Sequence, residues 1–159
     1  MSTEMRIPAQ QPVFTAPVRL RPHHLLCLQN FRGKGYSPAF VRKITEIHEL
    51  LLHPAPTRQS SKPPVTIQLV EGADTLCNSC PHCADGQCTS SGPSHFDALV
   101  LKQTGMSFGQ ILPLGIHSPK IPQVSEALLD RCCPGCTWLH FCKKICAQDS
   151  LAFRSEVPR

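Results

Sequence analysis

Long hydrophobic runs and aromatic side chains are both scarce in this chain of 159 residues. No segment approaches the roughly 20 apolar residues that a membrane-spanning helix needs. Only 6% of the residues are aromatic, whereas sixteen are proline. The length suits one domain, and the composition predicts a modest core with many loops, so we expect added stabilisation from cross-links or a metal.

The sequence also lacks the usual signatures of export and of catalysis. Its first residues contain no apolar run of signal-peptide length, so we predict a cytoplasmic protein in a reducing compartment. No glycine-rich phosphate loop, paired-carboxylate motif or nucleophile–base–orienter arrangement is visible. These absences leave catalysis open but favour a protein that is not an enzyme. Asp74, Asp85 and Asp97 are interpreted as turn and cap residues.

Positive charge is concentrated in one half of the chain without forming a dense run. The net charge is +5, and residues 1–62 contain nine Lys and Arg against three Asp and Glu. A basic half can contact nucleic acid. Because no dense cluster of Lys or Arg is present, we interpret the charge as a solvated surface and predict neither a nucleic-acid nor a membrane partner.

The order of apolar and turn residues predicts an α+β fold, mostly helical with a small sheet. Residues 1–17 are polar and rich in proline, which is typical of a disordered arm. Residues 18–147 are predicted to form one cysteine-rich, metal-stabilised domain that contains a proline-rich loop at 53–64. Residues 148–159 are interpreted as a C-terminal tail.

Apolar periodicity and helix-start residues locate the individual elements. Ser37 is a good N-cap before Pro38, and the apolar residues that follow recur at helical spacing as far as Leu52. The segment at 106–117 is ambiguous. Strands are predicted at 18–21 and 65–70, and helices at 22–31, 38–52, 94–104, from Pro122 (or Ser118) to about 129, and at 137–147.

Cysteine is the abundant residue of this sequence. It contains ten cysteines, nine of which lie between residues 77 and 146 in two tight groups. An even number permits disulfides in an oxidising compartment. In a reducing cytosol, clustered cysteines more often bind metal or carry out redox chemistry.

The first group is a C-x2-C-x2-C-x4-C run formed by Cys77, Cys80, Cys83 and Cys88. A tight turn brings two sulfurs separated by two residues to the same side. The run is close to the ferredoxin pattern but differs by one residue in its last gap, and it also fits a zinc knuckle. His82 lies inside the loop and is interpreted as an exposed residue or a neighbour of the ligands.

The second group contains a C-x2-C formed by Cys133 and Cys136, with a Pro-Gly turn between them. Cys142 and Cys146 are four residues apart and share a helix face. Adjacent cysteines seldom bind one metal because neighbouring side chains point apart, so Cys132 is not expected to be a ligand.

A third set of candidate ligands lies near the N-terminus, where His23, His24 and Cys27 occupy positions i, i+1 and i+4. On a helix, Cys27 shares a face with both histidines. Two interpretations remain open: a ligand face turned towards a metal, or a helix start followed by a buried cysteine.

Three stretches taken together resemble the bacterial and archaeal family known as domain of unknown function 1284. They are Arg19–Cys27, Gln68–Cys88 and Cys133–Cys142, and the resemblance spans roughly residues 18–142. It implies iron–sulfur binding and a functional role for the N-terminal motif. The residues it implies as ligands or functional neighbours are Cys77, Cys80, Cys88, Cys133, Cys136, Cys142, His23, His24 and Cys27. Cys83, Cys132 and Cys146 are additions to the family pattern.

These observations predict an iron–sulfur protein, with [4Fe–4S] favoured over [2Fe–2S]. Two arrangements fit. In the first, one triplet (Cys77, Cys80 and Cys88) and a second triplet (Cys133, Cys136 and Cys142) share one cluster, with Cys27 available. In the second, each group holds its own centre, completed by Cys83 or Cys146. The expected role is electron transfer with a redox partner protein, or sensing of redox state or iron. The alternative is a structural zinc module that contacts a protein or nucleic acid.

Overall fold

The structure is a computed structural model that describes residues 17–52, 65–90, 92–113, 115 and 118–155. It has the α+β architecture predicted from the sequence. Its elements in chain order are β1 (Val18–Leu20), α1 (Pro22–Gln29), α2 (Pro38–Leu52), β2 (Thr66–Leu69), the short 3₁₀ helix η1 (Cys77–Ser79), β3 (Cys83–Ala84), β4 (Gln87–Cys88), α3 (Pro93–Thr104), β5 (Ile111–Pro113), α4 (Glu126–Cys132) and α5 (Leu139–Ser155).

A three-stranded sheet with the order β1-β2-β5 forms one side of the core. β2 pairs in parallel with β1 and antiparallel with β5, so that Ile67 lies between Val18 and Leu112. All three side chains are buried, as are Leu20 and Leu69. The alternation of buried and less buried residues along β2 confirms the strand predicted at 65–70.

Helix α2 follows the sequence prediction closely. Ser37 Oγ accepts a hydrogen bond from the Phe40 backbone N–H at 3.1 Å, which caps the first turn. The apolar face of the helix is buried at Phe40, Ile44, Ile47 and Leu51. This periodicity therefore predicted both the helix and the face that packs against the core.

The structure corrects two sequence predictions and resolves one ambiguous segment. Helix α4 begins at Glu126 and not near Pro122, because the Ser125 hydroxyl caps it by accepting the Leu128 N–H at 3.1 Å. Helix α5 does not end near residue 147 but continues to Ser155. The ambiguous segment at 106–117 contains the edge strand β5. The predicted arm at 1–17, apart from residue 17, and the loop at 53–64 lie outside the described residues.

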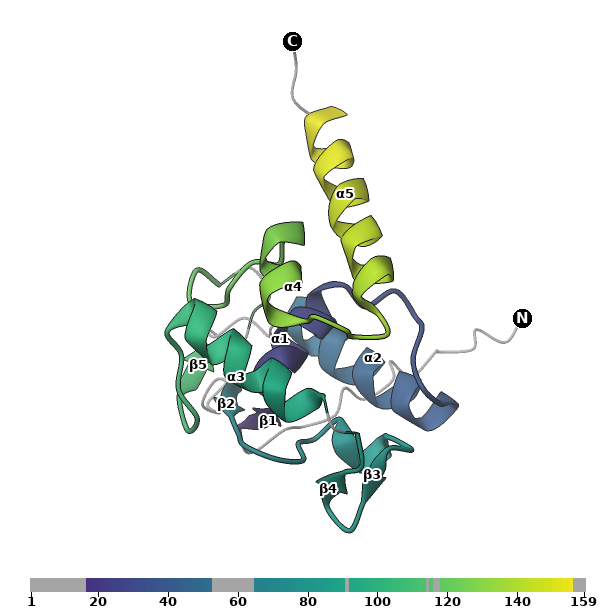
Figure 1. The fold of residues 1–159 in the computed structure, drawn as a ribbon, viewed down its shortest axis with the longest axis vertical. Coiled ribbons are helices and arrows are strands. Elements are labelled where there is room, and N and C mark those ends of the chain that lie inside the picture. The colour runs from purple at the N-terminus through teal and green to yellow at the C-terminus, as the bar shows by residue number, and fades with distance from the viewer. Residues whose placement is uncertain (1–16, 53–64, 91, 114, 116–117, 156–159) are drawn as a thin grey trace, which may run out of the picture.

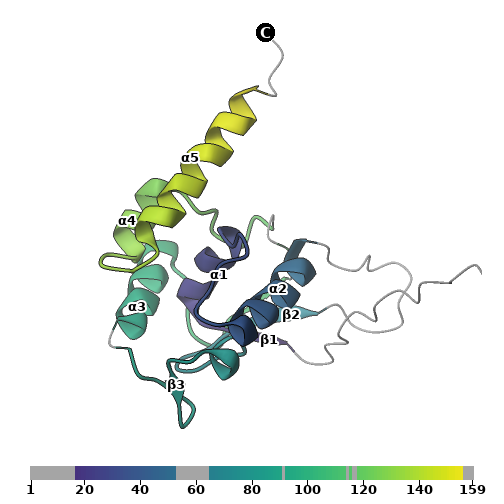
Figure 2. The same cartoon turned by 90° about the vertical axis from the view of Figure 1, so that its right-hand side faces the viewer.

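The helices gather around α1, which lies near the middle of the molecule (Figure 1). α1 contacts α2 and α3, and α4 packs between α3 and α5. The β3–β4 hairpin and the projecting end of α5 lie at opposite ends of the molecule in both views (Figure 2). Among the described residues, no helix combines the length and the hydropathy required to cross a bilayer.

Candidate metal centre

The N-terminus of α1 is anchored by two buried carboxylates. Asp97 Oδ2 on α3 accepts a hydrogen bond from Arg21 Nε at 2.7 Å, and both side chains are only 3% exposed. Asp74 Oδ2 accepts the Arg21 backbone N–H at 2.6 Å. These contacts fix the start of α1 against two segments that are distant in sequence.

The same carboxylates orient the two histidines of α1. His23 Nδ1 lies 2.6 Å from Asp97 Oδ1, and His24 Nδ1 lies 2.5 Å from Asp74 Oδ2. Because an ionised carboxylate only accepts hydrogen bonds, each Nδ1 is the donor, and in a neutral ring Nε2 keeps its lone pair. The two rings are tilted by 50° to each other, with their centroids 4.3 Å apart. The result is a pair of carboxylate–imidazole dyads side by side.

The charge states of these dyads follow from burial and neighbours. Burial and the adjacent His24 lower the pKa of His23 to about 4, although Asp97 opposes them. Burial acts to raise the pKa of Asp74, but His24 and the backbone N–H donors hold that pKa well below its ordinary range. His23 is therefore neutral and Asp74 ionised at neutral pH.

Asp74 also connects α1 to the first cysteine group. Its Oδ1 atom accepts the backbone N–H of Leu76 at 2.9 Å and that of Cys77 at 3.0 Å. One carboxylate therefore holds His24, the start of α1 and the start of η1 together. The sequence interpretation of Asp74 as a turn residue describes only part of this role.

The sequence interpretation of Asp97 as a cap or turn residue describes only part of its role, because its Oδ1 accepts the His23 backbone N–H at 3.2 Å in the first turn of α1. Asp97 lies within α3 and is buried against Arg21 and His23. Only contacts between distant segments reveal this, because Asp97 is more than 70 residues from both partners.

The second cysteine group lies beside α1. Burial, together with the nearby Cys133, Cys142 and Cys136 sulfurs, raises the pKa of Cys27 well above its ordinary value. Cys27, Cys136 and Cys142 line a cavity of about 120 Å³, which we call the Cys27 cavity. Cys133 lies one tight turn before Cys136, whose backbone N–H donates to the Cys133 carbonyl at 3.1 Å. The fold therefore adds Cys27 to the second predicted triplet.

The first cysteine group lines a different, smaller space. Cys77, Cys80 and Cys88 line a cavity of about 70 Å³, which we call the Cys77 cavity, and both histidines of α1 border it. Cys83 pairs with Cys88 across the β3–β4 hairpin but lines neither cavity. Cys83 is therefore not part of the cavity wall that the other three cysteines of this group form.

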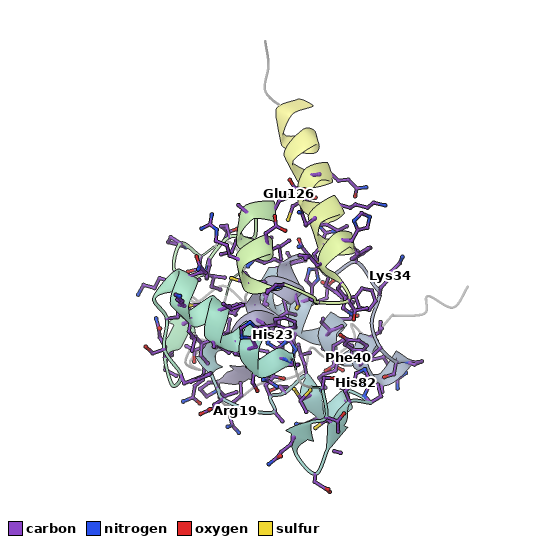
Figure 3. All side chains as sticks on the ribbon, viewed as in Figure 1. Arg19, His23, Lys34, Phe40, His82 and Glu126 are labelled. Carbon is purple, nitrogen blue, oxygen red and sulfur yellow. The ribbon has the colours of Figure 1, made fainter. Side chains whose placement is uncertain are left out.

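The two cavities are neighbours that share one wall. His23, His24, Tyr36, Phe40 and Pro93 border both of them. Figure 3 shows His23 near the middle of the molecule, Lys34 towards the loop before α2, and His82 near the hairpin. The histidine pair thus lies between the two cysteine groups, and the two triplets face two spaces and not one.

The spacing of possible ligand atoms differs between these spaces. A ring nitrogen of His24, a carboxylate oxygen of Asp74 and Cys77 Sγ lie within 4.8 Å of one another. Within the described part of the chain, no three cysteine sulfurs are that close. The sulfurs of both cysteine groups are therefore spread more widely than this trio of atoms.

Cys132, Cys133 and Cys146 lie outside both cavity walls. Cys132 is fully buried in the hydrophobic core. Cys146 Sγ lies 3.7 Å from Asn30 Nδ2, and the same nitrogen is 3.4 Å from the Cys142 carbonyl. Asn30 borders the Cys27 cavity. Its amide is a polar group beside Cys142 and Cys146, and sequence patterns did not identify it. All ten cysteines are in described residues, and none forms a disulfide.

Aromatic rings cover the space between the two cysteine groups. Tyr36 makes edge contacts with His82 from the first group and with Trp138 from the second, at centroid distances of 4.9 and 5.8 Å. Trp138 in turn contacts Phe141, over which Lys34 Nζ lies at 5.2 Å. His82 is thus a ring contact of Tyr36 as well as a border residue of the Cys77 cavity.

The fold and site define a small α+β protein in which two cysteine groups flank a buried pair of carboxylate–imidazole dyads. The model of the family described as protein of unknown function (DUF1284) matches residues 35–142. The chain belongs to this family, as its motifs predicted. The match begins after His23, His24 and Cys27, so it does not include the N-terminal motif. No curated protein and no solved structure matches the chain.

Proposed function

We propose that this protein binds a [4Fe–4S] cluster through Cys27, Cys133, Cys136 and Cys142, and that it acts in electron transfer or in redox or iron sensing. The observation that carries the proposal is the position of Cys27. Cys27 of α1 lines one cavity with Cys136 and Cys142 and lies near Cys133, all of them more than 100 residues away in the sequence. Together they form a set of four thiols, the number that a cubane cluster requires.

The wide spacing of these sulfurs is compatible with the ligand set of a cluster. Tetrahedral zinc with bonds of about 2.3 Å places its sulfur ligands only about 3.8 Å apart. No three cysteine sulfurs of the described residues lie within 4.8 Å of one another. In a cubane each thiolate binds a different iron, so its four ligands are spread more widely.

The Cys27 cavity also suits the cluster in size and lining. A cavity of about 150 Å³ accommodates a benzene molecule, and the Cys27 cavity of about 120 Å³ is comparable. A compact core of four irons and four sulfides is of similar bulk. Phe31, Phe40, Trp138 and Phe141 supply aromatic walls that limit water, and water access influences cluster potential.

Polar groups at the cavity suit an anionic cluster. A cubane bound to four thiolates is commonly negative, and Lys34 and Arg32 border the cavity. The Asn30 amide N–H near Cys146 Sγ is a donor close to these sulfurs. N–H donors to cluster sulfurs shift the reduction potential. Cys136 and Cys142 are only partly buried, which favours electron exchange with a partner at this surface.

The test is anaerobic reconstitution with ferrous iron and sulfide, followed by metal and sulfide quantitation and visible absorption. We expect about four irons and four sulfides per chain in the wild type. The Cys136→Ser variant should lose the cluster, whereas the matched Cys132→Ser variant should keep it because Cys132 is fully buried in the core and is not one of the sulfurs near Cys27. A colourless wild type without iron, or full iron in Cys136→Ser, would refute the proposal.

A second measurement separates the two roles. Electron transfer requires reversible reduction of an intact cluster, which dithionite reduction followed by mild reoxidation detects in the visible spectrum. Sensing requires that oxygen or iron depletion removes the cluster, which the release of iron to a chelator detects.

A further inference from the structure

We propose that the first cysteine group forms a separate site for a single metal ion of the zinc class, bound by Cys77, Cys80, Cys88 and His24. This site shares no ligand with the cluster proposed above and does not depend on it. Three thiolates and one imidazole form a closed tetrahedral set of the kind found in structural zinc sites.

The first argument is the distance between ligand atoms. Zinc–sulfur bonds of about 2.3 Å and zinc–nitrogen bonds of about 2.0 Å place ligand atoms between about 3 and 4 Å apart. A His24 ring nitrogen and Cys77 Sγ already lie within 4.8 Å of one another. This separation suits one ion at these two atoms. The Cys77, Cys80 and Cys88 sulfurs are not all within 4.8 Å of one another, so the ion would draw the η1 and hairpin segment inward.

The second argument concerns Asp74, which lies in the same tight group. Each of its oxygens already accepts two hydrogen bonds, from the Arg21 N–H and His24 on one side and from the Leu76 and Cys77 N–H groups on the other. Asp74 therefore positions the ligands and is not itself one. Metal-binding histidines almost always donate their other N–H to such a carboxylate, which fixes the ring and raises its basicity.

The third argument selects His24 over His23. The Asp74 carboxylate accepts hydrogen bonds from His24 Nδ1 and from the Cys77 backbone N–H, so both proposed ligands are positioned by the same side chain. His23 is held by Asp97, which ties it to α3 and to Arg21. The geometry of His24 is thus coupled to the first cysteine group, whereas that of His23 is not.

The fourth argument is the weakness of the local fold. Cys80 and Cys88 belong to a segment of one 3₁₀ turn and a hairpin with two-residue strands. The hairpin turn places Asp85 at φ 50° and Gly86 at φ 74°, and residues 84–87 are exposed. A two-stranded hairpin is at best marginally stable in water. A structural metal supplies folding free energy to such segments.

The size of the space supports the same conclusion. Cys80 and Cys88 border the Cys77 cavity of about 70 Å³ together with Cys77 and His24. The Cys27 cavity, at about 120 Å³, is the larger of the two. The smaller space and the mixed sulfur and nitrogen ligands suit one ion and not a cubane.

The test uses full-length protein carrying Cys136→Ser, so that the proposed cluster cannot contribute, titrated with cobalt(II) and then with zinc(II). We expect one cobalt per chain, with absorption bands typical of tetrahedral coordination and of thiolate ligands, and displacement by zinc. Adding Cys80→Ser should abolish the bands. Adding His24→Gln or Asp74→Asn should weaken the affinity by about 10- to 100-fold.

Two matched variants serve as controls, and circular dichroism confirms that each variant is folded. Cys83→Ser should leave the cobalt spectrum and affinity unchanged, and His23→Gln should keep the spectrum and weaken the affinity less than His24→Gln does. Loss of the bands in Cys83→Ser with retention in His24→Gln would overturn the proposal in favour of a four-cysteine site. Iron with stoichiometric sulfide in the Cys136→Ser protein would overturn it in favour of a second cluster. An iron-free wild type that still binds cobalt would refute the cluster alone.

Discussion

The two cysteine groups differ in what holds their sulfurs in place. The second group lies between α4 and α5, where Cys133 is buried in the same core as Leu129. The first group lies on η1 and the short hairpin, where most side chains are at least partly exposed. The core therefore positions one set of thiols, whereas Asp74 and the proposed ligand bonds position the other.

This difference has a consequence for how each centre behaves without its metal. A group whose backbone belongs to packed helices keeps its geometry because apolar burial is independent of the metal. A group on a hairpin with little burial loses its order when the ligand bonds are removed. The two dyads join the groups, since His23 and His24 border both cavities.

The largest expected effect comes from Asp97→Asn, which would affect both groups together. The substitution leaves Arg21 buried without its ionic partner, and breaking a buried ion pair costs about 3–5 kcal/mol. Denaturant unfolding of the apoprotein measures this loss. Ordinary destabilisation of about 1 kcal/mol or less would show that the α1 anchor does not depend on this pair.

The pH dependence of that variant provides an independent check. Burial acts to raise the pKa of Asp97, but His23 and Arg21 hold it below its ordinary value. The ion pair therefore stabilises the fold above about pH 4, and this contribution is lost as the pH falls below that value. The stability difference between wild type and Asp97→Asn should shrink correspondingly in acid.

A smaller effect, and the one that most directly separates the two groups, is expected from removal of the proposed zinc ion. Treating the protein with a chelator should raise amide exchange in residues 77–88 by about 100-fold, equivalent to about 2.7 kcal/mol. Amides of α4 should change little. Hydrogen exchange with mass spectrometry measures both regions in one experiment, and equal loss of protection in both would contradict the comparison.

The smallest expected effect comes from removing two helix caps, only one of which lies on a helix that leads into the second cysteine group. Ser37→Ala at α2 and Ser125→Ala at α4 each remove one capping acceptor and should cost about 1 kcal/mol. Because α4 leads directly into the second group, Ser125→Ala should also speed cluster loss, whereas Ser37→Ala should not. Thermal unfolding and the decay of visible absorption measure the two effects, and equal decay rates would contradict this assignment.

Local patterns predicted the elements well where the decisive contact was short-range. Ser37 and the apolar face of α2 act within one helix, so the sequence located that helix correctly. The start of α4 was placed too early, because Pro122 and Ser125 both resemble helix starts and only the hydrogen bond to Leu128 identifies the real one. The segment that contains β5 stayed ambiguous because its strand pairing depends on β2, more than 40 residues earlier.

For the candidate site, cysteine spacing identified both groups, and a helix-start proline with the apolar stretch after it predicted the helix that carries His23, His24 and Cys27. It could not assign Cys27 to the second group, because that contact joins α1 to residues more than 100 positions away. Nor could it recognise Asp74 and Asp97 as the carboxylates that orient the histidines. A possible signal was the presence of two acidic residues in segments predicted to be ordered.

The sequence by itself determined the family, the α+β class and the residue types available to bind a metal, because these depend on composition and short-range spacing. Only the tertiary structure decided which sulfurs share a space and which histidine stands beside them. The reason is physical: ligand sets form where distant segments are packed together, and that packing depends on the burial of the whole apolar core.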